Sequence, residues 1–168
     1  TDVMKMMEYL PGVQLGSEAS TGIVVRGGSP EQNLILLDGV PIYNSNHAFG
    51  LFSVFNSDAI KNLTLIKGGF PARYGGRLSS LIDVRTKDGD LNKTIANGSL
   101  GLATAKIAVE GPFKKGKSSY FISGRTSYIK WYVQQFIPEM ERFYFTDLNL
   151  KFNFRLSMKD RLYLSAYA

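Results

Sequence analysis

Hydrophobic and polar residues alternate one by one along the second half of the chain, from about residue 93 onward. In the stretch YFTDLNLKFNFRL (144–156), Leu148 and Phe152 belong to a series of apolar residues at even positions that only Thr146 interrupts. The odd positions are polar or charged apart from Phe145. Successive side chains leave opposite faces of a β-strand, so this period of two predicts strands with one apolar and one polar face. The predicted strands cover residues 93–101, 103–111, 118–129, 143–156 and 161–168.

The first half carries shorter and more varied patterns. Met4, Met7 and Leu10 share one face of a short helix that Asp2 can cap. Apolar runs bounded by glycine or turn residues predict short strands within residues 21–28, 33–42, 63–69 and 81–87. A second short helix is predicted over DAIKN (58–62), capped by Ser57 or by its first residue, an aspartate. We therefore expect an α+β domain with a small mixed sheet over 1–92, followed by a strand domain over 93–168.

Three features of the second half favour strands that cross a membrane. The predicted strands are about 9–13 residues long, close to the ~10 residues with which a barrel strand crosses a bilayer. Aromatic residues such as Tyr120, Tyr128 and Tyr144 gather near strand ends, as they do at a lipid–water interface. Connections alternate between the short FKKGK and SMKD and the long KWYVQQFIPEMER, as in outer-membrane barrels. These features predict antiparallel transmembrane β-barrel strands.

Composition argues against several kinds of function. The 168 residues include no cysteine and one histidine, so the sequence predicts no disulfide framework, no thiolate site and no multi-histidine metal centre. No carboxylate pair has a spacing useful for catalysis, and we expect neither an enzyme nor a cofactor. The net charge of +6 lies entirely in residues 95–168, yet its basic residues are dispersed and form no stripe suited to nucleic acid.

One motif suggests nucleotide binding and is rejected on its context. GPFKKGKS (111–118) matches the phosphate-binding loop pattern, in which backbone N–H groups cradle phosphates at the start of a helix. Here the motif lies between two alternating segments, and no helical period follows it. Pro112 also removes one backbone donor. We therefore interpret the motif as a tight turn between two strands.

Four stretches of the first half follow one another in a recognisable order. They are LPGV (10–13), IVVRGG (23–28), LILLDGVPIYN (34–44) and the segment from DAIKN to KDG (58–89). They supply a Pro-Gly-Val turn, an Arg-Gly strand end, an Asp-Gly-Val-Pro hairpin, and a Lys-Gly-Gly turn followed by Tyr-Gly. In this the chain resembles the plug domain and first barrel strands of TonB-dependent outer-membrane receptors, and the resemblance covers essentially its whole length.

The resemblance implies a receptor in the outer membrane of a Gram-negative bacterium. Such a receptor binds an extracellular nutrient and imports it by energy-coupled rearrangement of the plug. The implied partners are a TonB-type energy-coupling protein, outer-membrane lipid, and an extracellular small-molecule, glycan or peptide ligand, with a surface lipoprotein as an additional candidate. About five strands are too few to close a barrel. We expect an excerpt of a longer protein, with the segment that contacts the coupling protein outside this chain.

The resemblance also implies a position for the ligand site. By the family's topology, three plug loops face outward: RGGSPEQN (26–33), YNSNHAFG (43–50) and GGFPARYGG (68–76). The ligand-facing candidates on these loops are Gln32, Tyr43, Asn44, His47, Phe70, Arg73 and Tyr74. The candidates for releasable charge pairs that lock the plug to the barrel are Arg26, Asp38, Arg77 and Arg85. For each of these residues, loop packing or an ordinary surface ion pair is the alternative.

Two other classes of protein stay open at the level of sequence. A passive outer-membrane barrel or an adhesin has similar strands, although an open pore needs no plug. A soluble β-rich binding module shows the same alternation when a sheet is buried on one face only. The side of the strands that the protein buries separates the membrane interpretation from the soluble one.

Overall fold

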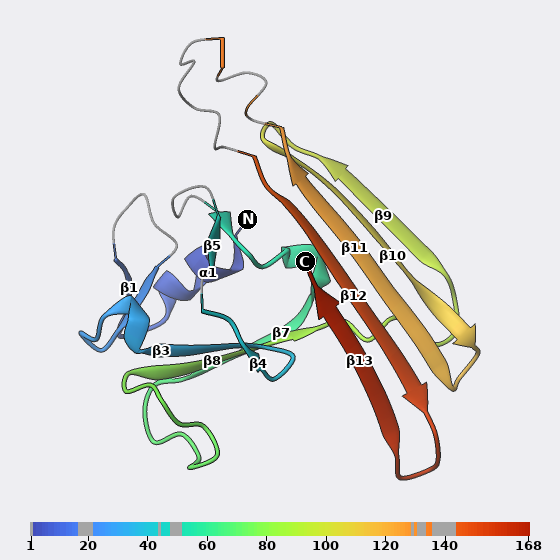
Figure 1. The fold of residues 1–168 in the computed structure, drawn as a ribbon, viewed down its shortest axis with the longest axis horizontal. Helices are drawn as coiled ribbons and strands as arrows, with labels where there is room; N and C mark the ends of the chain where they lie inside the picture. Colours follow the sequence, from blue (N-terminus) through green and yellow to red (C-terminus); the bar gives the residue numbers. More distant parts are fainter. Residues whose placement is uncertain are drawn as a thin grey trace. The chain divides into compact units, whose positions relative to one another are not determined.

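The computed structural model of the chain forms two compact units, Thr1–Thr86 and Lys87–Ala168 (Figure 1). The structure describes residues 2–16, 22–43, 45–47, 52–128, 130, 134–135 and 144–168. The division after Thr86 lies shortly before residue 92, where the sequence placed the end of the first domain.

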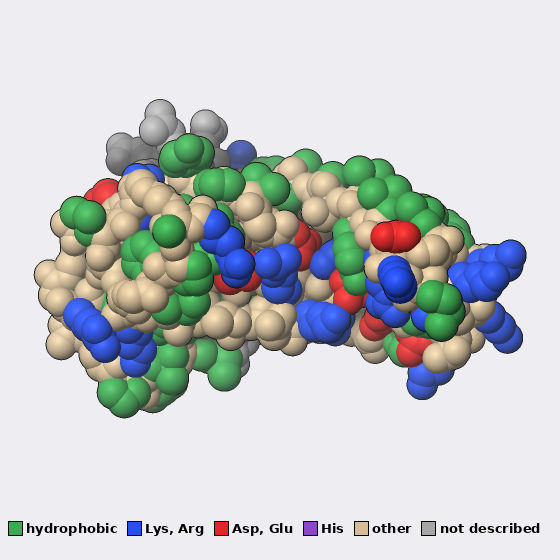
Figure 2. Space-filling view, turned by 90° about the horizontal axis from the view of Figure 1, so that it is seen from below, with side chains coloured by type: hydrophobic (Ala, Val, Ile, Leu, Met, Phe, Trp, Pro, Cys, Tyr) green, Lys and Arg blue, Asp and Glu red, His purple; other side chains and the backbone are tan. Residues whose placement is uncertain are grey.

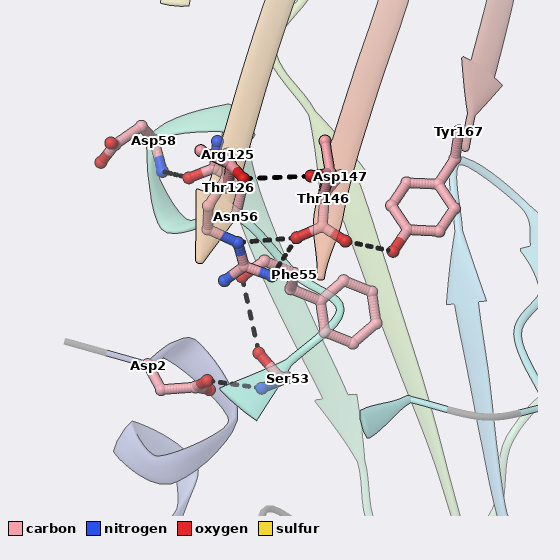
Figure 3. Close-up of polar contacts among 10 residues, drawn as sticks. All are labelled: Asp2, Ser53, Phe55, Asn56, Asp58, Arg125, Thr126, Thr146, Asp147 and Tyr167. Atoms are coloured by element: carbon pink, nitrogen blue, oxygen red, sulfur yellow. Dashed lines mark hydrogen bonds and ion pairs between the residues drawn. The ribbon is translucent and has the colours of Figure 1, made fainter. Parts of the chain in front are cut away.

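The first unit begins with helix α1 (Val3–Met6), which continues into the 3₁₀ helix η1 (Met7–Tyr9). The Asp2 side chain caps α1 as predicted, because its Oδ1 accepts a hydrogen bond from the Met4 backbone N–H at 2.9 Å. Its second oxygen accepts one from the Ser53 N–H at 2.8 Å (Figure 3). The predicted apolar face is confirmed for Met4 and Met7, which are both buried, but Leu10 follows the end of η1 and is 41% exposed. Asp2 therefore joins this helix to Ser53, which lies far along the sequence in the same unit.

A four-stranded mixed sheet forms the centre of the first unit. Its strands are β3 (Asn33–Leu37), β4 (Val40–Pro41), β7 (Ile60–Ile66) and β8 (Ser80–Thr86), in the order β4-β3-β8-β7. β3 and β8 are parallel, and the two outer strands are antiparallel to their neighbours. The consecutive residues Leu81 and Ile82 of β8 are both buried, so both faces of this inner strand are covered. The small mixed sheet predicted from the sequence is confirmed.

Shorter elements complete the first unit. Two antiparallel pairs join β1 (Val13–Leu15) to β2 (Ile23–Val25), and β5 (Asn46–His47) to β6 (Phe52–Ser53). The 3₁₀ helices η2 (Pro30–Gln32) and η4 (Ser57–Ala59) precede β3 and β7. Within the described residues, no helix is long and apolar enough to span a bilayer.

The helix predicted over DAIKN is wrong. Only the three residues of η4 are helical, and the cap is Asn56, whose side chain accepts a hydrogen bond from the Asp58 N–H at 3.2 Å. From Ile60 onward the chain pairs with β8, with a register irregularity near its start. A helix of five residues leaves most of its backbone N–H and C=O groups without partners, whereas the ladder with β8 satisfies them.

The second unit is one antiparallel sheet in which neighbours in sequence are neighbours in space (Figure 1). Its order is β13-β12-β11-β10-β9, and the strands are β9 (Ile95–Leu100), β10 (Thr104–Lys114), β11 (Ser118–Ser127), β12 (Thr146–Arg155) and β13 (Arg161–Tyr167). The five strands do not close on themselves. The motif GPFKKGKS forms the end of β10, the turn and the start of β11, so its interpretation as a hairpin is confirmed.

This sheet has its polar side chains inside and its apolar side chains outside. On β12 the four residues Asp147, Asn149, Lys151 and Asn153 are all at most 6% exposed. The residues between them are half-buried or exposed, and Leu148 is 40% exposed. On other strands of the sheet Ile107, Leu162 and Leu164 are more than half exposed. Figure 2 shows apolar side chains gathered along one side of this unit. A soluble one-sided sheet buries its apolar face, so this arrangement favours a sheet whose outer face meets lipid.

Candidate functional site

The topology of the four-stranded sheet brings the three predicted loops to one edge. Because β3 and β8 are parallel, the segments that lead into them, 26–32 and 67–79, meet at the same end of the sheet. β4 runs antiparallel to β3, so residues 42–43 and 45–47 that follow it return to that end. Backbone N–H groups of Leu78 and Ser79 both donate to the Gln32 carbonyl, at 3.2 and 3.0 Å. We call this end of the sheet the loop edge.

Two adjoining hollows open at the loop edge, with volumes of about 270 and 160 Å³. Residues from separate segments line both of them: Asn33, Ile35, Ile42, Tyr43 and Arg77. Glu31, Ser45 and Asn46 line the larger hollow alone, and Gly75 and Gly76 line the smaller. The walls combine apolar side chains with hydroxyl, amide, carboxylate and guanidinium groups, a mixture typical of small-molecule sites.

Asn33 holds the floor of the hollows in place. Its Nδ2 donates to the carbonyl oxygens of Ile23 at 2.6 Å and Pro30 at 3.2 Å, and its Oδ1 accepts from the Ser80 hydroxyl at 2.7 Å. Asn33 and Ser80 are both buried. One amide therefore joins β2, η2 and β8 at the point where β3 begins, and a buried amide with these partners is well satisfied.

The Arg26-Gly27-Gly28 sequence has a geometric reason. The Gly28 N–H donates to the Val25 carbonyl at 3.0 Å, and the two residues between them, Arg26 and Gly27, have φ of 51° and 76°. Consecutive positive φ values suit glycine and define a tight turn of the primed type. A Cβ on Gly28 would lie 2.6 Å from the Ser79 hydroxyl oxygen, so glycine also permits the close approach of two loops.

Charge at the hollows is mixed. The Arg77 guanidinium donates to the Gly76 carbonyl at 3.0 Å and lines both hollows. The Glu31 carboxyl accepts hydrogen bonds from the Glu31 backbone N–H and from the Ser29 hydroxyl. These bonds lower the pKa of the carboxyl, which therefore stays ionised at neutral pH. Tyr43 is 88% exposed, so its ring and hydroxyl are open to solvent. No cluster of three or more His, Asp or Glu side chains suited to a metal occurs in the described part of the chain.

The structure brings two of the predicted residues to the hollows and puts the others elsewhere. Tyr43, a ligand-facing candidate, and Arg77, a lock candidate, line them together. The Gln32 side chain instead accepts a hydrogen bond from the Ser29 N–H, and His47 lies in β5. Phe70, Arg73 and Tyr74 lie on the 67–79 loop outside the hollow linings, with the Arg73 guanidinium 4.8 Å from the Tyr74 ring centre. Asn44 lies outside the described residues.

Two of the other lock candidates, Asp38 and Arg85, have side-chain partners within the first unit. The Arg26 backbone N–H donates to the Gly12 carbonyl at 2.9 Å. The Asp38 carboxylate accepts hydrogen bonds from the backbone N–H and the hydroxyl of Thr86, at the end of the sheet opposite the loop edge. Arg85 pairs with Asp83 at 3.0 Å, and this hydrogen bond raises the pKa of Arg85. Pairing of these residues with barrel acids stays a prediction.

Sequence reasoning missed several residues of the hollows. Glu31 and Asn46 belong to two of the predicted loops but are not among the predicted ligand-facing residues, and the pattern marks Asn33 only as the boundary of an apolar run. The available signal for Asn33 was its position, because an amide at the start of an apolar run needs hydrogen-bond partners once it is buried.

The inner face of the second unit carries a buried ion pair. Arg125 of β11 and Asp147 of β12 lie directly opposite each other in the strand register. The Arg125 Nε donates to Asp147 Oδ2 at 2.7 Å, its Nη2 donates to the same oxygen, and the Tyr167 hydroxyl donates to Oδ1 at 3.0 Å (Figure 3). The Phe145 ring centre lies 4.9 Å from the guanidinium carbon. Both charged side chains are at most 5% exposed, so each compensates the other.

The segment that leads into the strands is bound to their inner face. Lys151 Nζ pairs with the Asp88 carboxylate at 3.0 Å, and the Ser119 hydroxyl donates to the Asp88 carbonyl at 2.7 Å. Gly89 has φ of 84°, and a Cβ there would lie 2.2 Å from the Tyr120 carbonyl oxygen. The segment therefore packs so closely on β11 that only glycine fits at this position.

Comparison with known proteins adds three findings. Residues 1–80 match the family model for the TonB-dependent Receptor Plug Domain. The chain is 30% identical over 106 residues to the Ferrienterobactin receptor of Escherichia coli (strain K12), which covers 52% of this chain and 14% of that protein. It is 28% identical over 91 residues to the Vitamin B12 transporter BtuB of Vibrio vulnificus (strain YJ016), which covers 51% of this chain and 15% of that protein.

Among solved structures, the siderophore receptor PirA from Acinetobacter baumannii has a similar fold. The TM-score is 0.69 at 20% identity, and the match covers 99% of this chain and 28% of that chain. The chain therefore spans a small part of the length of the relatives it matches, although nearly all of it has a counterpart in the fold of one of them.

Proposed function

We propose that the full-length protein binds an anionic extracellular nutrient at the loop edge and imports it. The premise is that the chain, through its plug domain, belongs to the TonB-dependent receptor family of the Gram-negative outer membrane. The import step is an energy-coupled rearrangement of the plug driven by a TonB-type partner. The plug carries one part of the ligand site, and the rest of the site lies in the barrel.

The observation that carries the proposal is the convergence of separate loops on one polar hollow. Arg77 lies far from Tyr43 and Asn46 in the sequence, yet all three residues line the same hollow. A guanidinium, a phenol and an amide can all donate hydrogen bonds to the oxygens of a ligand. Function concentrates on loops that a rigid sheet positions, and Asn33 supplies that rigidity here.

An anionic ligand is favoured by the Arg77 guanidinium and by the relatives. Among the relatives reported above, one is named as a receptor for ferrienterobactin and one as a siderophore receptor. The strand unit adds less free positive charge than its composition suggests, because Arg125 and Lys151 are each paired with an aspartate. The preference for an anion therefore depends mainly on Arg77.

The test compares two equally exposed tyrosines in the full-length receptor, expressed in cells that lack their own siderophore receptors. Tyr43→Ala and Arg77→Gln should each weaken binding of radiolabelled ferric enterobactin by about tenfold or more, since a hydrogen bond to a charged group contributes about 1.5–3 kcal/mol. Tyr9→Ala is the matched control, because Tyr9 is also 88% exposed but lies in η1, outside the linings of both hollows. Deleting the coupling protein should abolish uptake and leave binding intact.

Two outcomes would count against the proposal. If Tyr9→Ala weakens binding as much as Tyr43→Ala does, the loop edge has no special part in recognition. If the receptor instead binds vitamin B12 or a neutral glycan and Arg77→Gln has no effect, the ligand is not recognised through its negative charge.

A further inference from the structure

Two tight turns lie side by side at one end of the strand unit. The first joins β10 to β11 and is closed by a hydrogen bond from the Lys117 N–H to the Lys114 carbonyl at 2.9 Å. The second joins β12 to β13 and is closed by a bond from the Leu156 N–H to the Asp160 carbonyl at 3.0 Å. The Arg155 N–H donates to the Lys117 carbonyl at 2.9 Å, which connects the two turns directly.

These turns are strongly basic and exposed. Their cations are Lys114, Lys115, Lys117, Arg155, Lys159 and Arg161, and all six are exposed. The acidic side chain within the turns is Asp160, which accepts a hydrogen bond from the Ser157 hydroxyl at 2.6 Å. The segment beside the first turn contributes one charge of each sign, Asp90 and Lys93, which leaves the excess of cations unchanged. We call the six cations the basic belt.

A layer of aromatic rings lies next to the basic belt on the outward face of the sheet. The Phe113 ring centre lies 5.0 Å from that of Tyr120, 5.8 Å from Phe152 and 6.0 Å from Phe154. Phe113 is itself 58% exposed. Along the strands from their middle to this end, the outward side chains therefore change from aliphatic to aromatic, and the exposed cations of the basic belt follow in and beside the turns. This order matches the passage from the hydrocarbon core through the interface to the headgroups of a bilayer.

Apolar side chains also project among the cations. Leu156 and Met158 in the second turn are 69% and 86% exposed. In Figure 2 this end of the strands faces the viewer, and Lys and Arg side chains stand beside apolar ones. Cations interleaved with exposed apolar side chains fit a surface that offers both phosphate and hydrocarbon, which soluble phosphate or an acidic protein surface does not.

We propose that the basic belt binds the phosphate groups of anionic glycerophospholipids in the leaflet that the short turns face. In outer-membrane barrels short turns face the periplasm, so the lipids are those of the inner leaflet. Lysine and arginine near a membrane surface each gain free energy from anionic headgroups, and arginine forms paired hydrogen bonds with phosphate. The lipid would hold the turns at a fixed depth, whichever nutrient the receptor imports.

The experiment uses the folded full-length receptor in detergent micelles that contain brominated phosphatidylglycerol or brominated phosphatidylcholine, with tryptophan quenching as the readout of bound lipid. We expect the wild type to prefer phosphatidylglycerol by at least about fivefold, the gain from a single close cation. Lys114→Gln with Lys115→Gln removes two of the six cations and should clearly lower this ratio. Lys5→Gln with Lys61→Gln, two exposed or half-buried plug positions, makes the same change in net charge and should leave the preference unchanged.

Each other outcome overturns the proposal. Equal binding of the two lipids by the wild type shows that there is no preference for anionic lipid. Equal loss in both double variants shows a general effect of net charge rather than a local site. Displacement of brominated phosphatidylglycerol by millimolar glycerol phosphate shows a site for soluble phosphate. Lys61, Lys114 and Lys115 are exposed and Lys5 is half-buried, and the heat-dependent gel shift of the receptor checks that each variant has folded.

Discussion

Leu150→Lys should prevent most of the full-length receptor from assembling in the outer membrane. Leu150 lies near the middle of β12 on the outward face, between the buried Asn149 and Lys151. A lysine on the lipid face of a barrel costs about 2–4 kcal/mol near the middle of the bilayer. That is a large fraction of the ~5–15 kcal/mol that usually stabilises a folded domain. The measurement is the amount of heat-modifiable receptor in outer-membrane fractions compared with the wild type.

The matched control for this substitution is Leu156→Lys in the turn after β12. Leu156 is also an outward leucine but lies among the cations of the basic belt, where a lysine costs about 0–1 kcal/mol. The wild-type level of assembly is expected for Leu156→Lys. Equal assembly of both variants would mean that β12 is not surrounded by hydrocarbon.

The second large effect is expected from the buried ion pair of the inner face. Asp147→Ala leaves the Arg125 guanidinium without its carboxylate and removes the acceptor of the Tyr167 hydroxyl. Breaking one side of a buried pair costs about 3–5 kcal/mol, mostly because the remaining charge is not compensated. The temperature at which the receptor loses its folded mobility on a gel should therefore fall clearly below that of the wild type.

A double variant separates this charge effect from the loss of packing. Arg125→Met with Asp147→Leu removes both charges and keeps side chains of similar size. We expect it to be more stable than Asp147→Ala, because replacing a buried pair by apolar residues is often close to neutral. If the double variant is as unstable as the single one, the cost comes from lost packing and not from an isolated charge.

The alternation of β12 was predictable because it is local. Each side chain of the strand follows from its parity, and the polar parity is the buried one. The pairing of Arg125 with Asp147 was not predictable in the same way. It depends on the register between β11 and β12, which are joined by a long connection, and a shift of one residue would place Arg125 opposite an outward residue.

Tertiary contacts explain what the sequence did not reveal in the first unit. Residues 58–62 have a composition compatible with a helix. From Ile60 onward, however, their backbone groups form the hydrogen bonds that pair β7 with β8. The sequence predicts that Arg77, a cation of the plug, forms a charge pair that locks the plug to the barrel. Arg77 lines the hollows because the parallel pairing of β3 and β8 brings its loop beside Tyr43, a pairing that periodicity alone does not specify.

The physical account of both units is consistent with one receptor segment. Buried polar side chains such as Asn33 and Asp147 each have hydrogen-bond partners, and these partners fix loops and strands in position. The plug supplies a rigid edge with open polar groups, and the strands supply a wall with an apolar exterior. The proposed transport needs both properties, an open polar edge and an exterior that is stable in lipid.

The most direct test of this account is a spin-label scan at each position from 147 to 154 in a cysteine-free form of the full-length receptor in lipid vesicles. Collision rates are measured with oxygen, which concentrates in hydrocarbon, and with a water-soluble nickel chelate. We expect oxygen collisions to rise at 148, 150, 152 and 154 and to fall at the positions between them. Outward positions that collide with the nickel chelate instead, or a profile without a period of two, would contradict a lipid-facing strand.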